Sequence, residues 1–411
     1  MKRTLFSPLP RLLRLMVMGV LLLCASQVIA QENLTAGTGR WVGTWATAPQ
    51  PCVKRLMPYN NNLTGKTVRQ VIKVSIGGQL LRLRLSNEYG QQPVKVKSVY
   101  IASYKDSCDI VPSTAKYLRF NQNHEVTIPA GKAVASDALK YDLKPLQRLT
   151  ITINYAQSPE WPTVHPGSRT TSYIMKGVCT PRGKFQPQEK RNHWYTIAAL
   201  EVYDNHSSSI AIIGNSITDG TNSTTNGHNR WPDMLSEYLQ MKHKVTNQGV
   251  LNLGIGGNKV VMTGGNGDQA LKRFDRDVLR QAGVGKVVIF EGVNDIGQSK
   301  GNSEQVAQRL IAAYQEMVNK AKARKLKVYL ATITPFGNSG YFTYFHEAAR
   351  LYVNEWIRGQ KGKVDGIIDF DQVVRDPSHP NRLRAEFQSD WLHPNPAGYK
   401  AMGLYAAEIL K

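Results

Sequence analysis

Residues 209–220 read Ser-Ile-Ala-Ile-Ile-Gly-Asn-Ser-Ile-Thr-Asp-Gly, and this segment sets the class of fold. Residues 210–213 form a short apolar, β-branched run, which is typical of a buried parallel strand. The run stops at Gly214, Ser216 follows just past it, and residues 231–239 have the spacing of a helix. This order places a serine hydroxyl at the carboxyl edge of a sheet, where open α/β sheets bind ligands. A serine at such a turn can also serve only as a cap, so its role depends on the rest of the chain.

Beyond residue 204, predicted strands and helices alternate along the chain. The candidate strands are residues 210–213, 244–248, 286–291, 327–332 and 365–370. A helical stripe between the third and fourth strands consists of Val306, Leu310, Tyr314, Met317 and Ala321. Alternation of this kind predicts an α/β domain, with a parallel five-stranded sheet covered by helices on both faces. The flavodoxin-like strand order 2-1-3-4-5 would bring Ser216 and Asn294 together across 78 residues.

The first half of the chain has the two-residue period of strands instead. Apolar residues alternate with basic or polar ones over residues 67–76, 81–85, 94–97 and 149–154. Gly77-Gly78 is predicted to form a hairpin turn between the first two of these runs. We therefore expect an all-β, sandwich-like domain over residues 31–204, with the sandwich itself at about residues 61–190. The polar run at 204–209 is the predicted junction with a catalytic domain over residues 205–411.

The first 30 residues have the features of a secretory signal peptide. Four basic residues precede an apolar run at 15–24, and Val-Ile-Ala at 28–30 suits a cleavage site. The run is too short for a membrane span, so we expect export to the periplasm or the extracellular space. Lipid attachment at Cys24 is the alternative, but three leucines precede it where a small residue is expected.

The predicted mature chain is strongly basic. Without the leader, 48 of the 52 Lys and Arg residues remain against 30 Asp and Glu, which is a net charge of +18. Residues 31–204 carry +12 of this excess, which suits an acidic polysaccharide or an anionic membrane surface, or simply keeps the surface solvated. Nucleic acid is not an expected partner of an exported chain without a nucleic-acid motif. The remaining cysteines are Cys52, Cys108 and Cys179, which allow one disulfide of open pairing and contain no C-x-x-C zinc motif.

Four blocks in the second half carry a family resemblance. They are Gly-Asn-Ser-Ile-Thr-Asp-Gly at 214–220, Asn-Leu-Gly-Ile-Gly-Gly-Asn at 252–258, Val-Val-Ile-Phe-Glu-Gly-Val-Asn-Asp at 287–295 and Asp-Trp-Leu-His-Pro-Asn-Pro-Ala-Gly at 390–398. In this order they resemble the SGNH (GDSL) hydrolase family over about 200 residues, from residue 209 to the C-terminus. The G-x-S-x-G elbow of α/β-hydrolases is absent, because Gly220 lies four residues after Ser216.

The last block supplies the candidate base. His393 stands out among nine histidines because Asp390 lies three residues away in a proline-bounded loop, where its carboxylate can fix the imidazole tautomer. A base that faces Ser216 would activate its hydroxyl as a nucleophile. A surface Asp–His pair and a two-residue metal site are the other interpretations, although no further cluster of ligands supports a metal.

The resemblance also implies an oxyanion hole. In the family the donors are the N–H of the nucleophile, a glycine N–H and an asparagine side chain, which correspond here to Ser216, Gly257 and Asn294. Two other glycines precede Gly257 in its block, and glycines in such a loop can serve only the turn. Asn215 stands where the family usually has Asp before the nucleophile, which puts in doubt a charge at that position but no catalytic role.

Together these features predict an exported serine esterase that needs no metal or cofactor. Further segments resemble a two-domain bacterial branch of SGNH esterases that often occurs with polysaccharide-degrading enzymes; they lie at residues 41–50, 230–233, 273–277 and 291–297. The loops 221–229 and 263–269 are polar, which suits removal of acetyl or other short acyl groups from a carbohydrate. The aromatic segment 341–345 could stack on sugar rings, line an acyl groove or pack its helix. A lipase or lysophospholipase and a catalytically inactive carbohydrate-binding protein are the alternatives, and the oligomeric state is left open.

Overall fold

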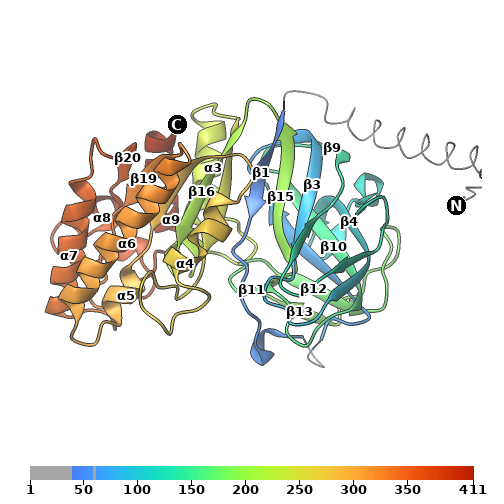
Figure 1. Cartoon of the computed structure of the whole chain (residues 1–411), viewed down its shortest axis with the longest axis horizontal. Helices are drawn as coiled ribbons and strands as arrows, with labels where there is room; N and C mark the ends of the chain where they lie inside the picture. Colours follow the sequence, from blue (N-terminus) through green and yellow to red (C-terminus); the bar gives the residue numbers. More distant parts are fainter. Residues whose placement is uncertain (1–38, 59–61) are drawn as a thin grey trace, which may run out of the picture. The chain divides into compact units, whose positions relative to one another are not determined.

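The computed structural model describes residues 39–58 and 62–411, so the predicted signal peptide lies outside the described residues. Residues Trp41–Lys411 form one compact unit, in which strands fill the first half and strands alternate with helices in the second (Figure 1). The predicted domain boundary between residues 204 and 205 therefore stays a prediction. Among the described residues, no helix combines the length and the hydrophobicity needed to span a membrane.

The second half is built on a parallel sheet of five strands. These are β16 (Ser208–Gly214), β17 (Gln248–Gly254), β18 (Val284–Phe290), β19 (Lys327–Ala331) and β20 (Gly366–Ile368). Their order in the sheet is β17-β16-β18-β19-β20, and every neighbouring pair is parallel. The predicted α/β class and the order 2-1-3-4-5 are confirmed. Because β16 lies between β17 and β18, the segments that leave these three strands start side by side.

The second strand of this sheet does not lie at residues 244–248, as the sequence pattern predicts. It runs from Gln248 to Gly254, where the chain carries its buried apolar residues Val250, Leu251 and Leu253. Residue 244 belongs to the turn after helix α3 (Trp231–Met241), and Lys244 has a left-handed φ of 58° that interrupts any strand there. The motif block that begins at residue 252 therefore starts inside the strand rather than after it.

Helices cover both faces of the parallel sheet. The longer ones are α3, α6 (Ser303–Ala323), α7 (Tyr344–Arg358) and α9 (Pro396–Leu410), and the shorter ones are α2 (Ser216–Asp219), α4 (Ala270–Phe274), α5 (Val293–Gly297) and α8 (Phe370–Val374). Ala211 of β16 packs in one core with α6 and α7, whereas its neighbours Ile210 and Ile212 pack in another with α3 and α9. The continuous apolar run at 210–213 therefore reflects burial on both sides of the sheet.

The first half consists mainly of two sheets around a shared core, and a third, two-stranded sheet pairs β11 (Val164–His165) with β14 (Trp194–Tyr195). One contains β1 (Arg40–Ala46), β15 (Ile197–Asp204), β3 (Gly78–Ser86), β8 (Ala133–Ala135) and β9 (Leu139–Leu143). The other contains β13 (Glu189–Arg191), β12 (Ser172–Lys176), β2 (Lys66–Lys73), β10 (Arg148–Gln157), β4 (Val94–Asp106), β5 (Asp109–Ile110), β6 (Lys116–Tyr117) and β7 (Val126–Ile128). Leu83 of the first sheet and Ile72 and Ile151 of the second lie in one buried cluster. The strand-rich first half is confirmed, but its sheets extend to residues 40 and 204 rather than 61 and 190.

The predicted hairpin at Gly77-Gly78 is wrong. β2 and β3 lie in different sheets, so the segment between them crosses from one layer to the other. Gly77 is needed there for a close approach rather than for a turn, because a Cβ at this position would lie 2.3 Å from Leu143 O. Alternating side chains determine which face of a strand is buried, but they do not determine its partner strand.

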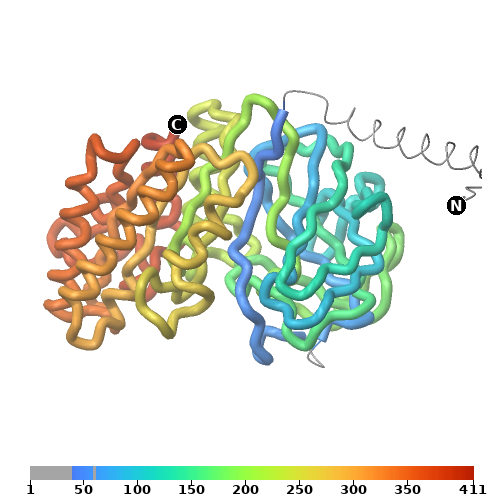
Figure 2. Tube along the Cα trace, in the orientation of Figure 1, coloured from blue at the N-terminus to red at the C-terminus, as the bar shows by residue number. Residues whose placement is uncertain are grey.

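The two halves are joined by a short connection and a shared core. β15 is followed by β16 after three residues (Figure 2). Ala46 of β1 and Ala199 of β15 belong to the same buried cluster as Leu251 of β17. The fit is tight at Gly43, where a Cβ would lie 2.9 Å from the Leu251 side chain. Strands of the first half thus cover part of one face of the parallel sheet.

Candidate active site

Ser216 lies at the turn between β16 and α2. Asn215 caps this short helix, since its Oδ1 accepts a hydrogen bond of 3.0 Å from the N–H of Ile217. Gly214 makes the turn possible, because a Cβ there would lie 2.1 Å from Thr218 Oγ1. Asn215 thus supplies the capping acceptor that an Asp would supply, so the turn tolerates the departure from the family pattern. Ser216 is nearly buried, with 7% of its surface exposed.

A continuous chain of hydrogen bonds joins the three residues predicted as a triad. The Ser216 hydroxyl lies 2.9 Å from His393 Nε2, and His393 Nδ1 lies 2.8 Å from Asp390 Oδ2. Ser216 and His393 are 177 positions apart in the sequence. The loop before α9 folds tightly around the carboxylate, because Asp390 Oδ1 accepts the N–H groups of Leu392 at 3.1 Å and of His393 at 2.7 Å.

Asp390 is held as a carboxylate. Partial burial would raise its pKa, but the hydrogen bonds from the ring and backbone of His393 outweigh this effect and keep the pKa of Asp390 below its usual value. Asn222, in the loop after α2, adds a hydrogen bond of 3.2 Å to Asp390 Oδ2. An ionised Asp390 favours the tautomer of His393 with its proton on Nδ1, which leaves Nε2 as the acceptor that faces Ser216.

Asn294 lies in α5, just after β18, and β18 is the neighbour of β16 in the parallel sheet. It is 2% exposed; its Nδ2 donates to Asn258 O at 2.8 Å, and its Oδ1 accepts from the Tyr341 hydroxyl at 3.0 Å. These contacts fix the orientation of the amide and leave one Nδ2 hydrogen without an acceptor among the described residues. Because Asn258 follows Gly257, the structure brings Asn294 and the glycine-containing block together.

The aromatic segment 341–345 has two different parts. Its first two residues are partly buried against the core, whereas Tyr344 and Phe345 are 85% and 77% exposed. Packing therefore explains only the first part of the segment. Sequence reasoning missed the contact of Tyr341 with Asn294, for which the local sequence holds no signal beyond a tyrosine in an aromatic run.

The three glycines of the block at 252–258 differ in how their N–H groups are used. The N–H of Gly254 donates to Asn252 Oδ1, and the N–H of Gly256 donates to Asp219 Oδ2, both at 3.0 Å. The N–H of Gly257 has no acceptor among the residues that the structure describes. Gly257 also has a left-handed φ of 75°, which favours glycine. Gly257 thus retains the free donor that its predicted role requires, and the role itself stays a prediction.

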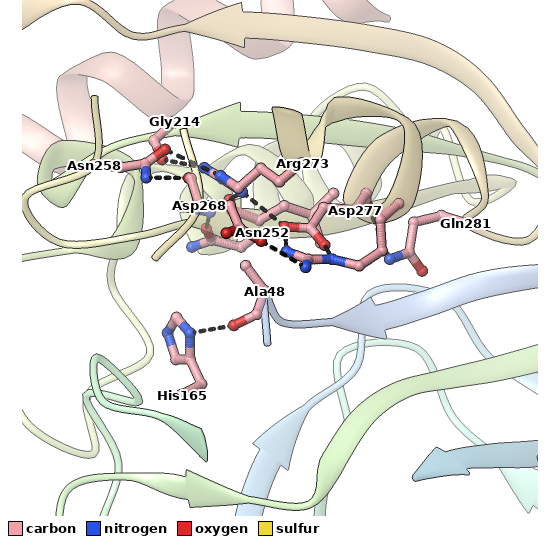
Figure 3. Close-up of polar contacts among 12 residues, drawn as sticks. Ala48, His165, Gly214, Asn252, Asn258, Asp268, Arg273, Asp277 and Gln281 are labelled. Carbon is pink, nitrogen blue, oxygen red and sulfur yellow. Dashed lines mark hydrogen bonds and ion pairs between the residues drawn. The ribbon is translucent and has the colours of Figure 1, made fainter. Parts of the chain in front are cut away.

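Asp219, three residues after Ser216, binds a histidine from the first half of the chain. His165 Nε2 lies 3.0 Å from Asp219 Oδ1. His165 Nδ1 lies 2.9 Å from Ala48 O (Figure 3). Burial would raise the pKa of Asp219, but the charges of His165 and Arg169 outweigh it and keep the pKa below its usual value. Asp219 and His165 thus form a buried pair, with an oxygen acceptor at each ring nitrogen of His165.

Sequence reasoning missed this pair. Asp219 stands in the first motif block, but no local pattern marks His165, which lies 54 positions away in the short strand β11 (Val164–His165). The other oxygen of Asp219 accepts the N–H of Gly256. The pair therefore connects the first half of the chain to the loop that carries Gly257.

The buried Arg273 forms hydrogen bonds to the C-terminal ends of β16 and β17, close in sequence to Ser216. Arg273 donates to Gly214 O at 3.1 Å and to Asn258 Oδ1 at 3.0 Å (Figure 3). It also donates to Leu253 O at 2.8 Å. Asp277 lies 3.1 Å from the guanidinium and balances its charge, while Glu291 lies 3.5 Å away. Burial raises the pKa of Glu291 to about 8, so this carboxyl is mostly protonated at neutral pH.

The described residues contain no group of three His, Cys, Asp or Glu side chains in a metal-binding arrangement. The metal-free mechanism stays a prediction. Cys52, Cys108 and Cys179 are all free thiols in the structure, and Cys108 packs against the small cluster that contains Cys179.

Several solved structures are similar to about half of the chain. A GDSL-like lipase from Bacteroides thetaiotaomicron is 23% identical, with 49% of this chain and 88% of that chain covered and a TM-score of 0.36. A carbohydrate acetylesterase family member from Sinorhizobium meliloti (14% identity, 49% and 97% covered, TM-score 0.40) and an acetyl xylan esterase (21% identity, 49% and 97% covered, TM-score 0.36) are also similar. A comparison with curated proteins finds no match.

Residues 212–401 match the GDSL-like lipase/acylhydrolase family. The matched segment contains Ser216, Gly257, Asn294, Asp390 and His393. It also spans the five parallel strands, from within β16 to β20. The chain therefore carries, over residues 212–401, a domain of the GDSL-like lipase/acylhydrolase family.

Proposed function

We propose that the protein is an exported serine esterase, in which Ser216 attacks the carbonyl carbon of a carboxylic ester. The family of the domain implies ester hydrolysis in general. The observation that carries the proposal is the hydrogen-bonded chain from Ser216 through His393 to Asp390, with distances of 2.9 and 2.8 Å. The proposed mechanism uses no metal and no cofactor.

His393 is the proposed general base. As Ser216 Oγ bonds to the carbonyl carbon, its proton passes to His393 Nε2, and the carbonyl oxygen takes the negative charge. Asp390 stabilises the imidazolium through the bond to Nδ1. His393 then gives the proton to the departing alkoxide, which leaves an acyl-enzyme. A water molecule that His393 deprotonates attacks this acyl group, releases the acid and restores the serine.

The developing oxyanion needs fixed donors in a site from which water is largely excluded. We assign this role to the N–H of Ser216, the N–H of Gly257 and the free Nδ2 hydrogen of Asn294. Ser216 is the first residue of α2, so its N–H has no partner within the helix. Tyr341 and Asn258 hold the Asn294 amide from both sides, which reduces the reorganisation needed in the transition state.

The proposed substrates are acetyl or other short acyl esters of a carbohydrate. Long acyl chains need an extended apolar groove, whereas the loops 221–229 and 263–269 are polar. Residues such as Asn222 and Asn226 in the first loop and Asn266 in the second are exposed and offer hydrogen bonds to hydroxyl groups.

One observation favours lipid esters instead. The large apolar or aromatic side chains that α7 exposes are Tyr344 (85%), Phe345 (77%), Leu351 (48%) and Tyr352 (50%). Such a face suits contact with a lipid surface. The two functions are separated by kcat/KM for p-nitrophenyl acetate, butyrate, octanoate and palmitate, followed by acetate release from acetylated xylan and pectin. A maximum at eight carbons or more, without acetate release, would replace the carbohydrate esterase by a lipase.

The central test is turnover of p-nitrophenyl acetate. Ser216→Ala should lower kcat by about 10³-fold or more, and the double variant with His393→Ala should lose little beyond that, because the members of a triad act as a unit. Ser113→Ala, an exposed serine in the first half, is the matched control and should retain the activity. Losses that multiply would show that His393 does not serve Ser216. No turnover by the wild type would favour an inactive carbohydrate-binding protein.

Export is tested separately. If the leader ends at residue 30, the protein recovered from the periplasm or the medium should begin at Gln31. A mature protein that begins at Cys24 and is extracted with membranes would instead indicate lipid attachment.

A further inference from the structure

A cavity of about 370 Å³ lies next to the proposed oxyanion hole, between the two halves of the chain. Residues from the segments 50–56 and 166–169 line it on one side, and Asp219, Gly256 and residues 265–267 line it on the other. Gly256 directly precedes Gly257, so the cavity reaches the loop that carries one of the proposed oxyanion donors. The volume falls in the range of about 300–1,000 Å³ that is usual for sites that bind small ligands.

The cavity has an excess of positive charge. Asp219 is its acidic residue, and the buried His165 already compensates that charge. One guanidinium nitrogen of Arg169 donates to Thr221 Oγ1 at 2.8 Å. The same nitrogen lies 3.7 Å from Asp219 Oδ2, a distance too long for a direct hydrogen bond. Arg55 is exposed and has no ion pair or hydrogen bond with any other described residue. Two guanidinium groups thus remain available to an anionic ligand.

The opposite wall is formed largely by residues without side chains. Gly256, Gly265 and Gly267 line it, so a ligand can approach the backbone closely. Gly167, on the side of the arginines, is tightly constrained: a Cβ there would lie 2.0 Å from Asp219 Oδ2. The missing side chains at Gly256, Gly265 and Gly267 leave backbone N–H and C=O groups within reach of a hydroxyl-rich ligand.

We propose that this cavity binds a carboxylate-bearing sugar of an acylated acidic saccharide, while the ester itself lies at Ser216. The fork of an arginine guanidinium matches a carboxylate in geometry and charge, and Arg55 and Arg169 supply that fork. The first half of the chain then has a direct part in substrate selection, because it contributes both arginines. This inference rests on the proposed esterase function and specifies its substrate class.

The test compares two substrates that differ only in charge. Oligogalacturonides are chemically O-acetylated, and the carboxyl groups of a second portion of the same acetylated oligomers are then converted to neutral methyl esters, which leaves the acetyl pattern unchanged. The measured quantity is the ratio of kcat/KM for acetate release from the acidic and from the neutral oligomer. We expect the wild type to favour the acidic oligomer about tenfold, and 0.5 M NaCl to reduce this preference.

Arg55→Gln is the decisive variant, because Arg55 is exposed and its replacement does not disturb a buried contact. It should lower the acidic-to-neutral ratio about fivefold, the scale of one partly exposed ion pair. Arg169→Gln should lower it about tenfold, since that side chain is less exposed. Lys54→Gln is the matched control: Lys54 lies on the same short turn and carries the same charge, but it does not line the cavity.

The outcomes separate this inference from the proposed function. A wild type that hydrolyses p-nitrophenyl acetate but shows no preference for the acidic oligomer would overturn the inference and leave the esterase intact. Equal effects of Arg55→Gln and Lys54→Gln would also overturn it, because they would assign the preference to the long-range field of the basic first half. Absence of p-nitrophenyl acetate turnover would instead overturn the proposed function itself.

Discussion

Replacement of His165 by leucine tests whether the first half of the chain supports the catalytic loop. The substitution leaves the Asp219 carboxylate buried, with 3% of the side chain exposed, and removes its closest cation. It also leaves Ala48 O without its donor. Loss of one partner of a buried ion pair costs about 3–5 kcal/mol. Two contacts remain, the N–H of Gly256 at 3.0 Å and Arg169 at 3.7 Å, so we expect a loss near the lower limit, about 3 kcal/mol.

A double-mutant cycle isolates the interaction. Asp219→Asn removes the charge and keeps the size of the side chain, so the second substitution of the pair should cost about 2 kcal/mol less than it does alone. Free energies of unfolding from urea titrations at pH 7 give the four corners of the cycle. Single losses that add to within about 0.5 kcal/mol would refute a coupled ion pair.

The dependence on pH provides an independent check. The pKa of Asp219 is lower in the folded than in the unfolded protein, so its interactions stabilise the fold above about pH 4, and this contribution decreases as the pH falls. In His165→Leu the carboxyl has lost its main partner and is easier to protonate. The difference in stability between wild type and variant should therefore shrink between pH 7 and pH 4. A difference that grows on acidification would contradict the assignment.

Three further results are expected. Asn294→Ala should lower kcat for p-nitrophenyl acetate about 10²–10³-fold with little change in KM, as expected for the loss of one oxyanion donor. Tyr341→Phe should lower kcat less, because the Tyr341 hydroxyl only orients the Asn294 amide. An effect mainly on KM would make Asn294 a substrate-binding residue. Glu291→Gln should be more stable than the wild type by an amount that grows between about pH 4.3 and 8, at up to about 1.4 kcal/mol per pH unit. The reason is that, in this range, Glu291 of the wild type releases its proton only on unfolding. Urea titrations of both proteins that give the same difference in free energy of unfolding at every pH would contradict the raised pKa. EDTA should leave kcat/KM unchanged, because no step of the proposed mechanism uses a metal; activity lost in EDTA and restored by zinc would overturn the metal-free mechanism.

The parallel sheet and the candidate triad were predictable from sequence because their signals are local. An apolar run that ends in a small or polar residue marks each central strand, and Asp390 and His393 are three positions apart. The structure then brought Ser216 and His393 to 2.9 Å, although their catalytic roles remain predictions. The extent of β17 was missed, because the left-handed φ of Lys244 cannot be recognised from the sequence.

The contacts between the two halves were not predictable, because no periodicity encodes them. The partner of β2 depends on how two layers stack, and side-chain alternation is the same for a hairpin and for a crossover. His165 and Tyr341 lie 54 and 47 positions from Asp219 and Asn294, and the sequence around each of them holds no signal of the contact. Such residues are identified only by the atoms that they meet.

These contacts imply that the second half does not fold alone. Ala46 and Ala199 share a buried cluster with Leu251, so a fragment that begins at residue 205 would expose that face of the parallel sheet. It would also lack His165, the closest partner of the Asp219 carboxylate. We therefore expect residues 205–411 expressed alone to be insoluble or inactive toward p-nitrophenyl acetate, and co-expression with residues 39–204 to restore activity. A fragment that is monomeric, unfolds cooperatively and keeps the kcat of the full chain would show that the first half contributes neither to the core nor to the catalytic loop.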